Sequence, residues 1–146
     1  MNTDKTSSLS LRIFSKSLSC IDISNALDWQ PSEKFEKGEL WGGRTNKRPR
    51  EESLWIYNLD LDEKILITEQ LKSLIDKMLD KKDNFQKIKD ECQMDISCSY
   101  TTYNGQGGFT LEADLMRTFS SLNMDLSIDF YALDEIFEKS VVKPQD

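Results

Sequence analysis

The sequence predicts a single α+β domain, in which helices pack on one face of a mixed, mostly antiparallel β-sheet. Three observations indicate this class. The chain has 146 residues, the usual size of one domain. Segments with the two-residue period of strands alternate with segments of helical period, in the order β-α-β-β-α-α-β-α-β. Two of these strands follow each other without a helix between them, as in a hairpin.

The chain begins with a strand and a short helix. Apolar and polar residues alternate from Leu9 to Ile13, which predicts a half-buried strand. Ser19 and Asp22 have the spacing of a capping box, and the apolar residues that follow share one helical face. We therefore predict a helix that ends near Leu27, before the break at Pro31.

A polar, glycine-containing stretch follows from Pro31 to Ser53. It predicts a loop region with one short strand near Glu36 to Trp41. β-Branched and aromatic residues return in residues 54–59, which predict an interior strand covered on both faces and paired with the strand before it. Trp55, in this strand, is expected to lie in the core.

The strongest helical period runs from Asp62 to about Lys82, with apolar and charged residues on opposite faces. Asp60 and Glu63 have the spacing of a capping box and are expected to cap this helix. A break at Asp83-Asn84 then separates it from a further short helical segment that reaches Cys92.

The remaining elements are a strand, a helix and a last strand. Residues 94–101 alternate strictly, and residues 126–131 do so again at the end of the domain, where Asp125 and Asp129 are expected to face solvent. Between them, residues 111–122 have helical spacing. The apolar face of this helix is predicted to consist of Leu115, Met116, Phe119 and Leu122.

These elements define one domain at residues 8–133, between a flexible N-terminus at 1–7 and a charged tail at 134–146. No apolar stretch approaches the roughly 20 residues of a membrane span, and the first residues lack the features of a secretory signal. We therefore expect a cytoplasmic protein. The cysteines lack CxxC spacing and are expected to be reduced thiols: Cys20, Cys92 and Cys98.

Charge and composition exclude several functions. With 26 acidic and 19 basic side chains the formal charge is −7, which disfavours nucleic acid and membranes and favours a basic protein partner. The chain has no histidine, which excludes Ser-His-Asp triads, Cys-His dyads and His-ligated zinc. No metal or nucleotide motif is present, so we expect no catalytic residue, metal or cofactor. A carboxylate- or tyrosine-based enzyme stays open as a third class, as does the oligomeric state.

The main candidates for binding form one basic loop, which consists of Arg44, Lys47, Arg48 and Arg50. Arginine forks suit bidentate contacts with anions. The alternative is a solvated loop neutralised by Glu51 and Glu52. Trp41, beside two glycines and just before this loop, is the best candidate for an exposed aromatic contact.

A glycine-rich segment at residues 104–108 adds Tyr103, Asn104 and Gly105 as candidate contacts. It lacks the Gly-Lys-Ser/Thr of a P-loop and the GxGxxG spacing, and its glycines suit a turn with positive φ better than a phosphate-binding loop. Two hypotheses follow. The first is a non-catalytic protein-binding domain of the immunity or regulatory type. The second is a module that binds a small anionic ligand through residues 44–50 and 104–108.

The ordered features of the chain resemble the bacterial family known as domain of unknown function 4279, over about residues 8 to 133. The matching features are Ser10–Phe14, the helix before Pro31, Lys37-Gly38-Glu39, Ser53-Leu54-Trp55, Leu61–Lys64, Leu74–Leu79, Gly107-Gly108-Phe109, Leu111–Leu122 and Leu126–Tyr131. The resemblance implies an α+β domain in the bacterial cytoplasm and supplies no reaction, cofactor or catalytic residue. Relatives tend to carry His where this chain has Lys64, so a function of that imidazole would be missing here.

Overall fold

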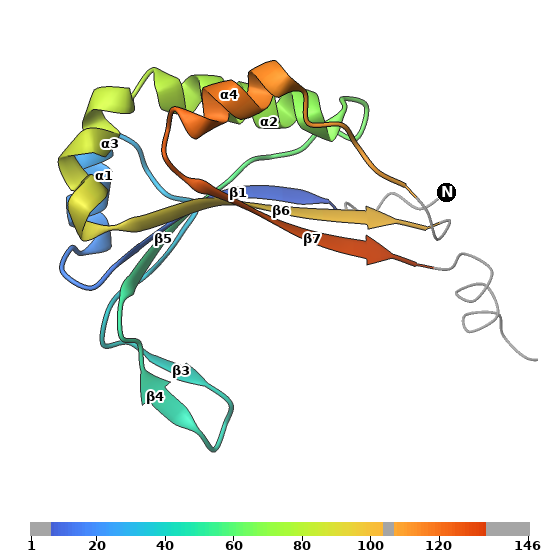
Figure 1. The fold of residues 1–146 in the computed structure, drawn as a ribbon. Helices are drawn as coiled ribbons and strands as arrows, with labels where there is room; N and C mark the ends of the chain where they lie inside the picture. Colours follow the sequence, from blue (N-terminus) through green and yellow to red (C-terminus); the bar gives the residue numbers. More distant parts are fainter. Residues whose placement is uncertain (1–6, 104–106, 134–146) are drawn as a thin grey trace, which may run out of the picture.

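The computed structural model describes residues 7–103 and 107–133, and shows a five-stranded sheet and a separate two-stranded hairpin (Figure 1). The strands are β1 (Ser8–Ser15), β2 (Glu33–Phe35), β3 (Leu40–Gly42), β4 (Lys47–Pro49), β5 (Ser53–Asn58), β6 (Gln93–Thr102) and β7 (Asp125–Ala132). The helices are α1 (Cys20–Leu27), α2 (Ile67–Leu79), α3 (Lys82–Ile88) and α4 (Ala113–Ser120), with a 3-10 turn at Lys89–Glu91. The predicted tail at 134–146 and most of the predicted N-terminal segment lie outside the described residues.

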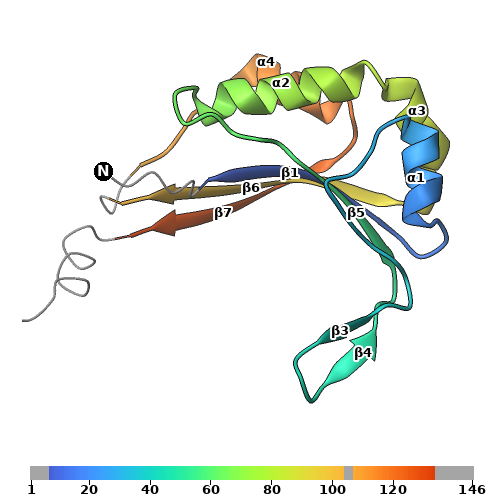
Figure 2. The ribbon, with the colours of Figure 1, turned by 180° about the vertical axis from the view of Figure 1, so that it is seen from behind.

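The sheet is mixed, and the helices cover one of its faces. Its strand order is β2-β5-β1-β6-β7, and every neighbouring pair is antiparallel except β6 and β7. All four helices lie on the same side of the sheet, as the two opposite views show (Figure 1, Figure 2). The predicted fold class, a single α+β domain with helices on one face, is therefore confirmed.

The core lies between the sheet and the helices. The alternating residues of β1 predicted to be buried are fully buried there, and Trp55 of β5 is also fully buried. The covering helices supply the other half of this apolar layer. Its fully buried members from α1 and α2, with at most 1% of their surface exposed, are Cys20, Ile23, Leu27, Leu74, Ile75 and Met78.

The polar stretch between α1 and β5 contains three short strands rather than the single predicted one. β2 pairs with β5 at one edge of the sheet, while β3 and β4 pair only with each other among the described strands. The predicted strand at Glu36 to Trp41 was therefore misplaced. Because each of these strands has only three residues, none is long enough to show a period in the sequence.

The predicted cap of the long helix was wrong. α2 begins at Ile67, and its N-cap residue Leu66 makes no side-chain cap bond. The segment before it is held instead by Gln70, whose side chain accepts from the N–H of Asp62 at 2.8 Å and donates to the carbonyl of the same residue at 2.9 Å. The start of α2 is therefore held by the buried side-chain amide of Gln70, in the first turn of the helix, and not by the predicted capping box of Asp60 and Glu63.

Three smaller predictions also need correction. The break after the long helix lies at Asp80-Lys81, not at Asp83-Asn84, and Cys92 has extended rather than helical backbone. Met116 is 50% exposed, although the helical spacing predicted it on the buried face of α4. β5 is interior in the sheet, but its second face is not covered by helices.

Candidate functional site

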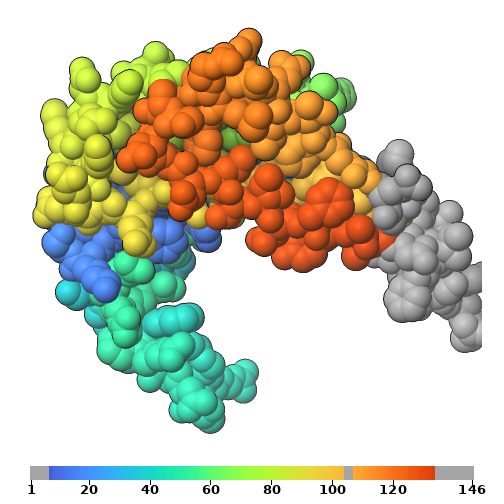
Figure 3. All heavy atoms as spheres, viewed as in Figure 1, coloured from blue at the N-terminus to red at the C-terminus, as the bar shows by residue number. Residues whose placement is uncertain are grey.

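The face of the sheet without helices is the most distinctive surface of the molecule. β3 and β4 leave the end of the sheet as a hairpin and extend beneath this open face (Figure 1). The space-filling view shows a hollow between the hairpin and β7 (Figure 3). Where the hairpin meets the sheet, the hollow contains a cavity of about 430 Å³, which we call the hairpin groove. Its lining consists of Phe14, Trp41, Arg48, Pro49, Arg50, Glu51, Glu52 and Leu54.

The pairing of the hairpin brings Trp41 and two arginines together. Trp41 lies directly opposite Arg48, and opposed residues in antiparallel strands share a face. Arg50 follows two residues later and returns to the same side. The guanidinium carbons of Arg48 and Arg50 lie 5.1 and 5.2 Å from the centre of the Trp41 ring. Two cation–π contacts therefore hold an exposed tryptophan in place.

Arg50 also connects the hairpin to the main sheet. Its guanidinium lies 4.3 Å from the centre of the Phe35 ring in β2, so the arginine contacts two aromatic rings. Its backbone N–H donates to Glu39 at 2.8 Å, and its carbonyl accepts from Gly38 at 2.9 Å. The side chain of Arg50 thus joins the hairpin to β2, and its backbone holds the two arms of the hairpin together at their base.

Gly42 makes the turn of the hairpin possible. Its φ of +122° belongs to a region that side chains other than glycine rarely adopt, and a Cβ there would lie 2.5 Å from the carbonyl oxygen of Asn46. The close approach of the two strands, and with it the position of Trp41, therefore depends on glycine at this residue.

The basic side chains of the hairpin form no ion pair in the described part of the chain, although Glu51 and Glu52 line the same groove. Within residues 7–103 and 107–133 the ion pairs are Arg12 with Asp95 and Arg117 with Asp114. Neither Glu51 nor Glu52 forms an ion pair with the basic loop there, although both follow it directly in sequence. The guanidinium groups of Arg48 and Arg50 are therefore not held by a carboxylate, while Glu51 and Glu52 place two negative charges in the same groove, so the neutralised loop stays a prediction.

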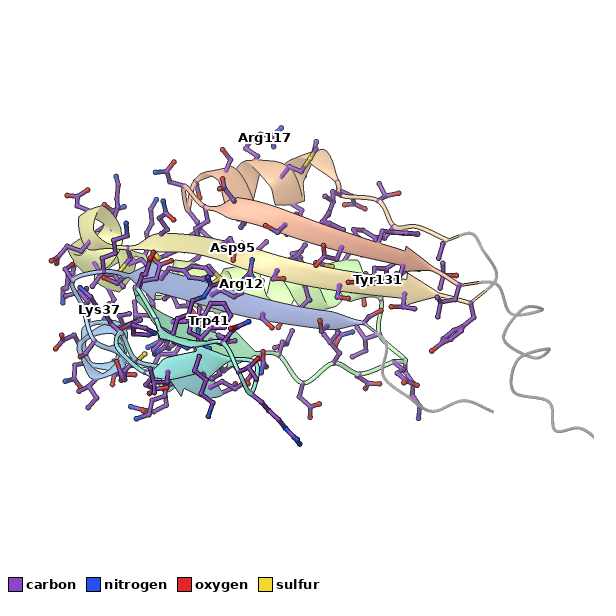
Figure 4. The ribbon with its side chains drawn as sticks, turned by 90° about the horizontal axis from the view of Figure 1, so that it is seen from below. Arg12, Lys37, Trp41, Asp95, Arg117 and Tyr131 are labelled. Carbon is purple, nitrogen blue, oxygen red and sulfur yellow. The ribbon has the colours of Figure 1, made fainter. Side chains whose placement is uncertain are left out.

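The middle of the open face carries a bidentate ion pair (Figure 4). Arg12 Nε and Nη2 donate to the two carboxylate oxygens of Asp95 at 2.9 and 2.6 Å, and Ser127 Oγ donates to the same carboxylate at 3.0 Å. The hydrogen bonds that Arg12 donates to Asp95 raise the pKa of Arg12 above its ordinary value. Beyond this pair, Asp125 and Asp129 of β7 are exposed, as predicted. The hollow therefore has a basic wall at the hairpin and an acidic wall at β7.

The structure divides the predicted binding residues into two groups. Trp41, Arg48 and Arg50 line the hairpin groove, and Arg44 and Lys47 lie on the same hairpin in exposed positions. Tyr103 instead lines a cavity of about 610 Å³, together with Gly108 and the segment before α2. This cavity shares no lining residue with the hairpin groove.

Two predicted contacts of the glycine-rich segment, Asn104 and Gly105, lie outside the described part of the chain. Sequence reasoning missed Phe14 and Leu54, the sheet residues that form the floor of the groove. They are cross-strand neighbours on the open face. In the sequence, these two residues are recognisable only as members of alternating strand segments. The alternation does not show which face of the sheet the hairpin lies against.

The cysteines are free, and the geometry does not suit them to nucleophilic chemistry. Burial is the main cause that raises the pKa of all three thiols, and together with the nearby Glu36 it raises the pKa of Cys20 to about 11. The thiolate is the reactive form, so these side chains are poor nucleophiles at neutral pH. Among the described residues, no group of three Cys, Asp or Glu side chains is placed to hold a metal ion.

The raised pKa of Cys20 makes stability depend on alkaline pH. An unfolded thiol ionises near pH 9, whereas the folded one stays protonated to about pH 11. Stability should therefore be full below pH 9 and should fall by about 1–2 kcal/mol as the pH rises through this window. Urea unfolding at pH 8 and at pH 10.5 measures the loss, and Cys20→Ala should reduce it. An equal loss in that variant would show that other groups cause it.

Together, the described residues form an α+β domain with a groove at the base of its hairpin. The chain belongs to the family whose model is called domain of unknown function DUF4279, which matches residues 4–133. It matches none of the curated proteins and none of the solved structures with which it was compared. No helix in the described ranges is long and apolar enough to cross a membrane.

Proposed function

We propose that this chain is a non-catalytic protein-binding domain, of the immunity or regulatory type, that holds its partner in the hollow between the hairpin and the open face of the sheet. The observation that carries this proposal is Trp41. Its side chain is 43% exposed, yet Arg48 and Arg50 fix its orientation toward the groove. Tryptophan and arginine are among the residue types most enriched at the few interface positions that supply most of the binding energy.

The charge distribution supports a partner that is basic overall. The formal charge of −7 favours association with a basic protein, and the acidic β7 wall of the hollow would face its cations. The hairpin would contact an acidic or aromatic residue of the same partner, because neither Arg48 nor Arg50 forms an ion pair with a carboxylate among the described residues. The free cysteines are consistent with a cytoplasmic location, where thiols stay reduced.

The test is to capture the partner from a lysate of the source organism and then measure its affinity in purified form. We expect Trp41→Ala to weaken binding at least about tenfold. The matched control is Leu40→Ala: Leu40 is 68% exposed on the same hairpin but on its opposite side. Raising the salt from about 0.1 M to about 0.5 M should also weaken binding, because it screens the exposed charges.

Two results would contradict the proposal. The first is that no protein is captured at low salt. The second is that Trp41→Ala and Leu40→Ala weaken binding equally, since that would place the contact outside the groove.

A small anionic ligand is a second candidate occupant of the groove, and Arg48 supports it because this guanidinium forms no ion pair among the described residues. Its test is a thermal-shift series with nucleotides and inorganic polyphosphate. Stabilisation that is lost in Arg48→Gln and kept in Lys89→Gln, an exposed cation outside the groove, would favour this candidate over a protein partner.

A further inference from the structure

The two edges of the five-stranded sheet differ in their protection. β2 has three residues and is followed at once by the hairpin, so it offers little backbone to another strand. β7 has eight residues, and within the described chain no strand pairs with its outer edge. It contains neither proline nor lysine, which are common devices that protect an edge strand. β7 therefore has a long outer edge whose backbone N–H and C=O groups can pair with another strand.

The backbone groups on this edge can be identified. The N–H of Leu133 donates to the carbonyl of Thr102 in β6 at 2.8 Å, so odd-numbered residues of β7 direct their backbone groups inward. The alternate residues Leu126, Ile128 and Phe130 direct N–H and C=O outward. The same edge also exposes apolar side chains, since Ile128 is 43% and Phe130 47% exposed.

We infer that the outer edge of β7 pairs with β7 of a second copy of this chain. The two strands would run antiparallel about a two-fold axis perpendicular to the sheet at Ile128. Ile128 would then lie opposite itself, and Leu126 opposite Phe130 of the second copy. All these residues have outward backbone groups, so each pair is of the hydrogen-bonded type, in which the two residues exchange both N–H···O=C bonds. Their side chains share the helix-covered side of the sheet and would bury one another.

The carboxylates of β7 disfavour the two registers next to this one. With the axis at Ile128, Asp125 lies opposite Tyr131, and Asp129 lies opposite Ser127. An axis at Ser127 would place Asp125 opposite Asp129, and an axis at Asp129 would place that carboxylate opposite its own copy. Like charges directly opposite each other destabilise a strand pair, so both neighbouring registers are disfavoured.

The resulting assembly would be one continuous sheet of the two copies. Because the axis is perpendicular to the sheet, both open faces, and therefore both hairpin grooves, would point in the same direction. The grooves lie at the outer ends of this sheet, since β5 and the hairpin are on the side of each copy away from β7 (Figure 1). The pairing uses no residue of the hairpin groove and leaves Asp125 and Asp129 on the open face, so it does not rest on the proposed function.

The first experiment measures mass by light scattering and sedimentation over a dilution series. The wild-type chain should show a monomer–dimer equilibrium that tightens with salt, because each copy carries a charge of −7. Ile128→Lys should abolish the dimer. Met116→Lys is the matched control: it replaces a 50% exposed apolar residue of α4 by the same cation and should leave the dimer intact.

The second experiment tests the register by oxidation, in a Cys92→Ser background that removes the one partly exposed native thiol. Hydrogen-bonded antiparallel pairs have Cα atoms about 5.5 Å apart, within the range of a disulfide. Ile128→Cys should therefore cross-link two chains. Phe130→Cys should not, because its own copy would lie four residues along the strand, about 13 Å away.

Three outcomes would overturn the inference. One is a wild-type chain that stays monomeric at every concentration and salt. Another is a dimer that survives Ile128→Lys, and the third is cross-linking by Phe130→Cys in place of Ile128→Cys. If the chain is monomeric and Ile128→Lys instead weakens capture of a partner protein, the edge receives a partner strand rather than a second copy.

Discussion

Replacement of Trp55 by alanine is expected to lower the free energy of unfolding by about 3–5 kcal/mol, the range for loss of a buried aromatic side chain. Trp55 is fully buried and meets the ring of Trp29 edge-to-face, with the ring centres 5.9 Å apart. Its Nε1 donates to Ser24 Oγ at 3.0 Å in the buried interior. Alanine would remove the ring contacts, leave a cavity under α1 and leave the hydroxyl of Ser24 without its partner.

Urea unfolding followed by circular dichroism measures this loss. Ser24→Ala separates the hydrogen bond from the packing and should cost about 1 kcal/mol. Trp41→Ala is the matched tryptophan control, and it should cost at most about 1 kcal/mol because its ring is exposed and makes only cation–π contacts of that size. Equal losses at Trp41 and Trp55 would show that the hairpin is part of the core, and binding results with Trp41→Ala would then need another explanation.

The long elements of this fold could be predicted because one-sided burial imposes a period on them. β6 alternates between apolar and polar side chains from Met94 to Thr101, and the buried residues of α2 recur on one helical face, so their positions followed from the sequence. Element ends depend instead on single side-chain contacts. The side-chain amide of Gln70 holds the segment before α2 through hydrogen bonds to Asp62, eight residues earlier. No local sequence pattern shows that this contact, and not a capping box, fixes the start of the helix.

The candidate site was predictable only in part. Trp41 was expected to be exposed because it lies among glycines and charges rather than in a periodic segment, and the structure confirms its exposure. The hairpin that carries it was missed because it is stabilised by guanidinium–ring contacts, not by apolar burial. Phe14 and Leu54 become part of the groove through strand register, which joins distant residues and leaves no signature in either segment alone.

The ion pair between Arg12 and Asp95 should contribute far more to stability than the one between Arg117 and Asp114, although the shortest N–O distance is 2.6 Å in both. The side chains of the first pair are 34% and 15% exposed, and those of the second 74% and 90%. Water and salt screen the second pair almost fully. The first is bidentate, and Ser127 also donates to its carboxylate.

A double-mutant cycle of Arg12→Ala and Asp95→Ala is therefore expected to give a coupling energy of about 1–2 kcal/mol, reduced from that of a buried pair by the partial exposure of Arg12. The cycle of Arg117→Ala and Asp114→Ala should give a coupling too small to measure. Because the pKa of Arg12 is raised, this residue stays charged up to strongly alkaline pH, and the first coupling should not change between pH 7 and pH 9. Equal couplings in the two cycles would mean that water reaches the middle of the open face freely. The floor of the hollow would then be a solvated surface rather than a rigid one against which a partner can pack.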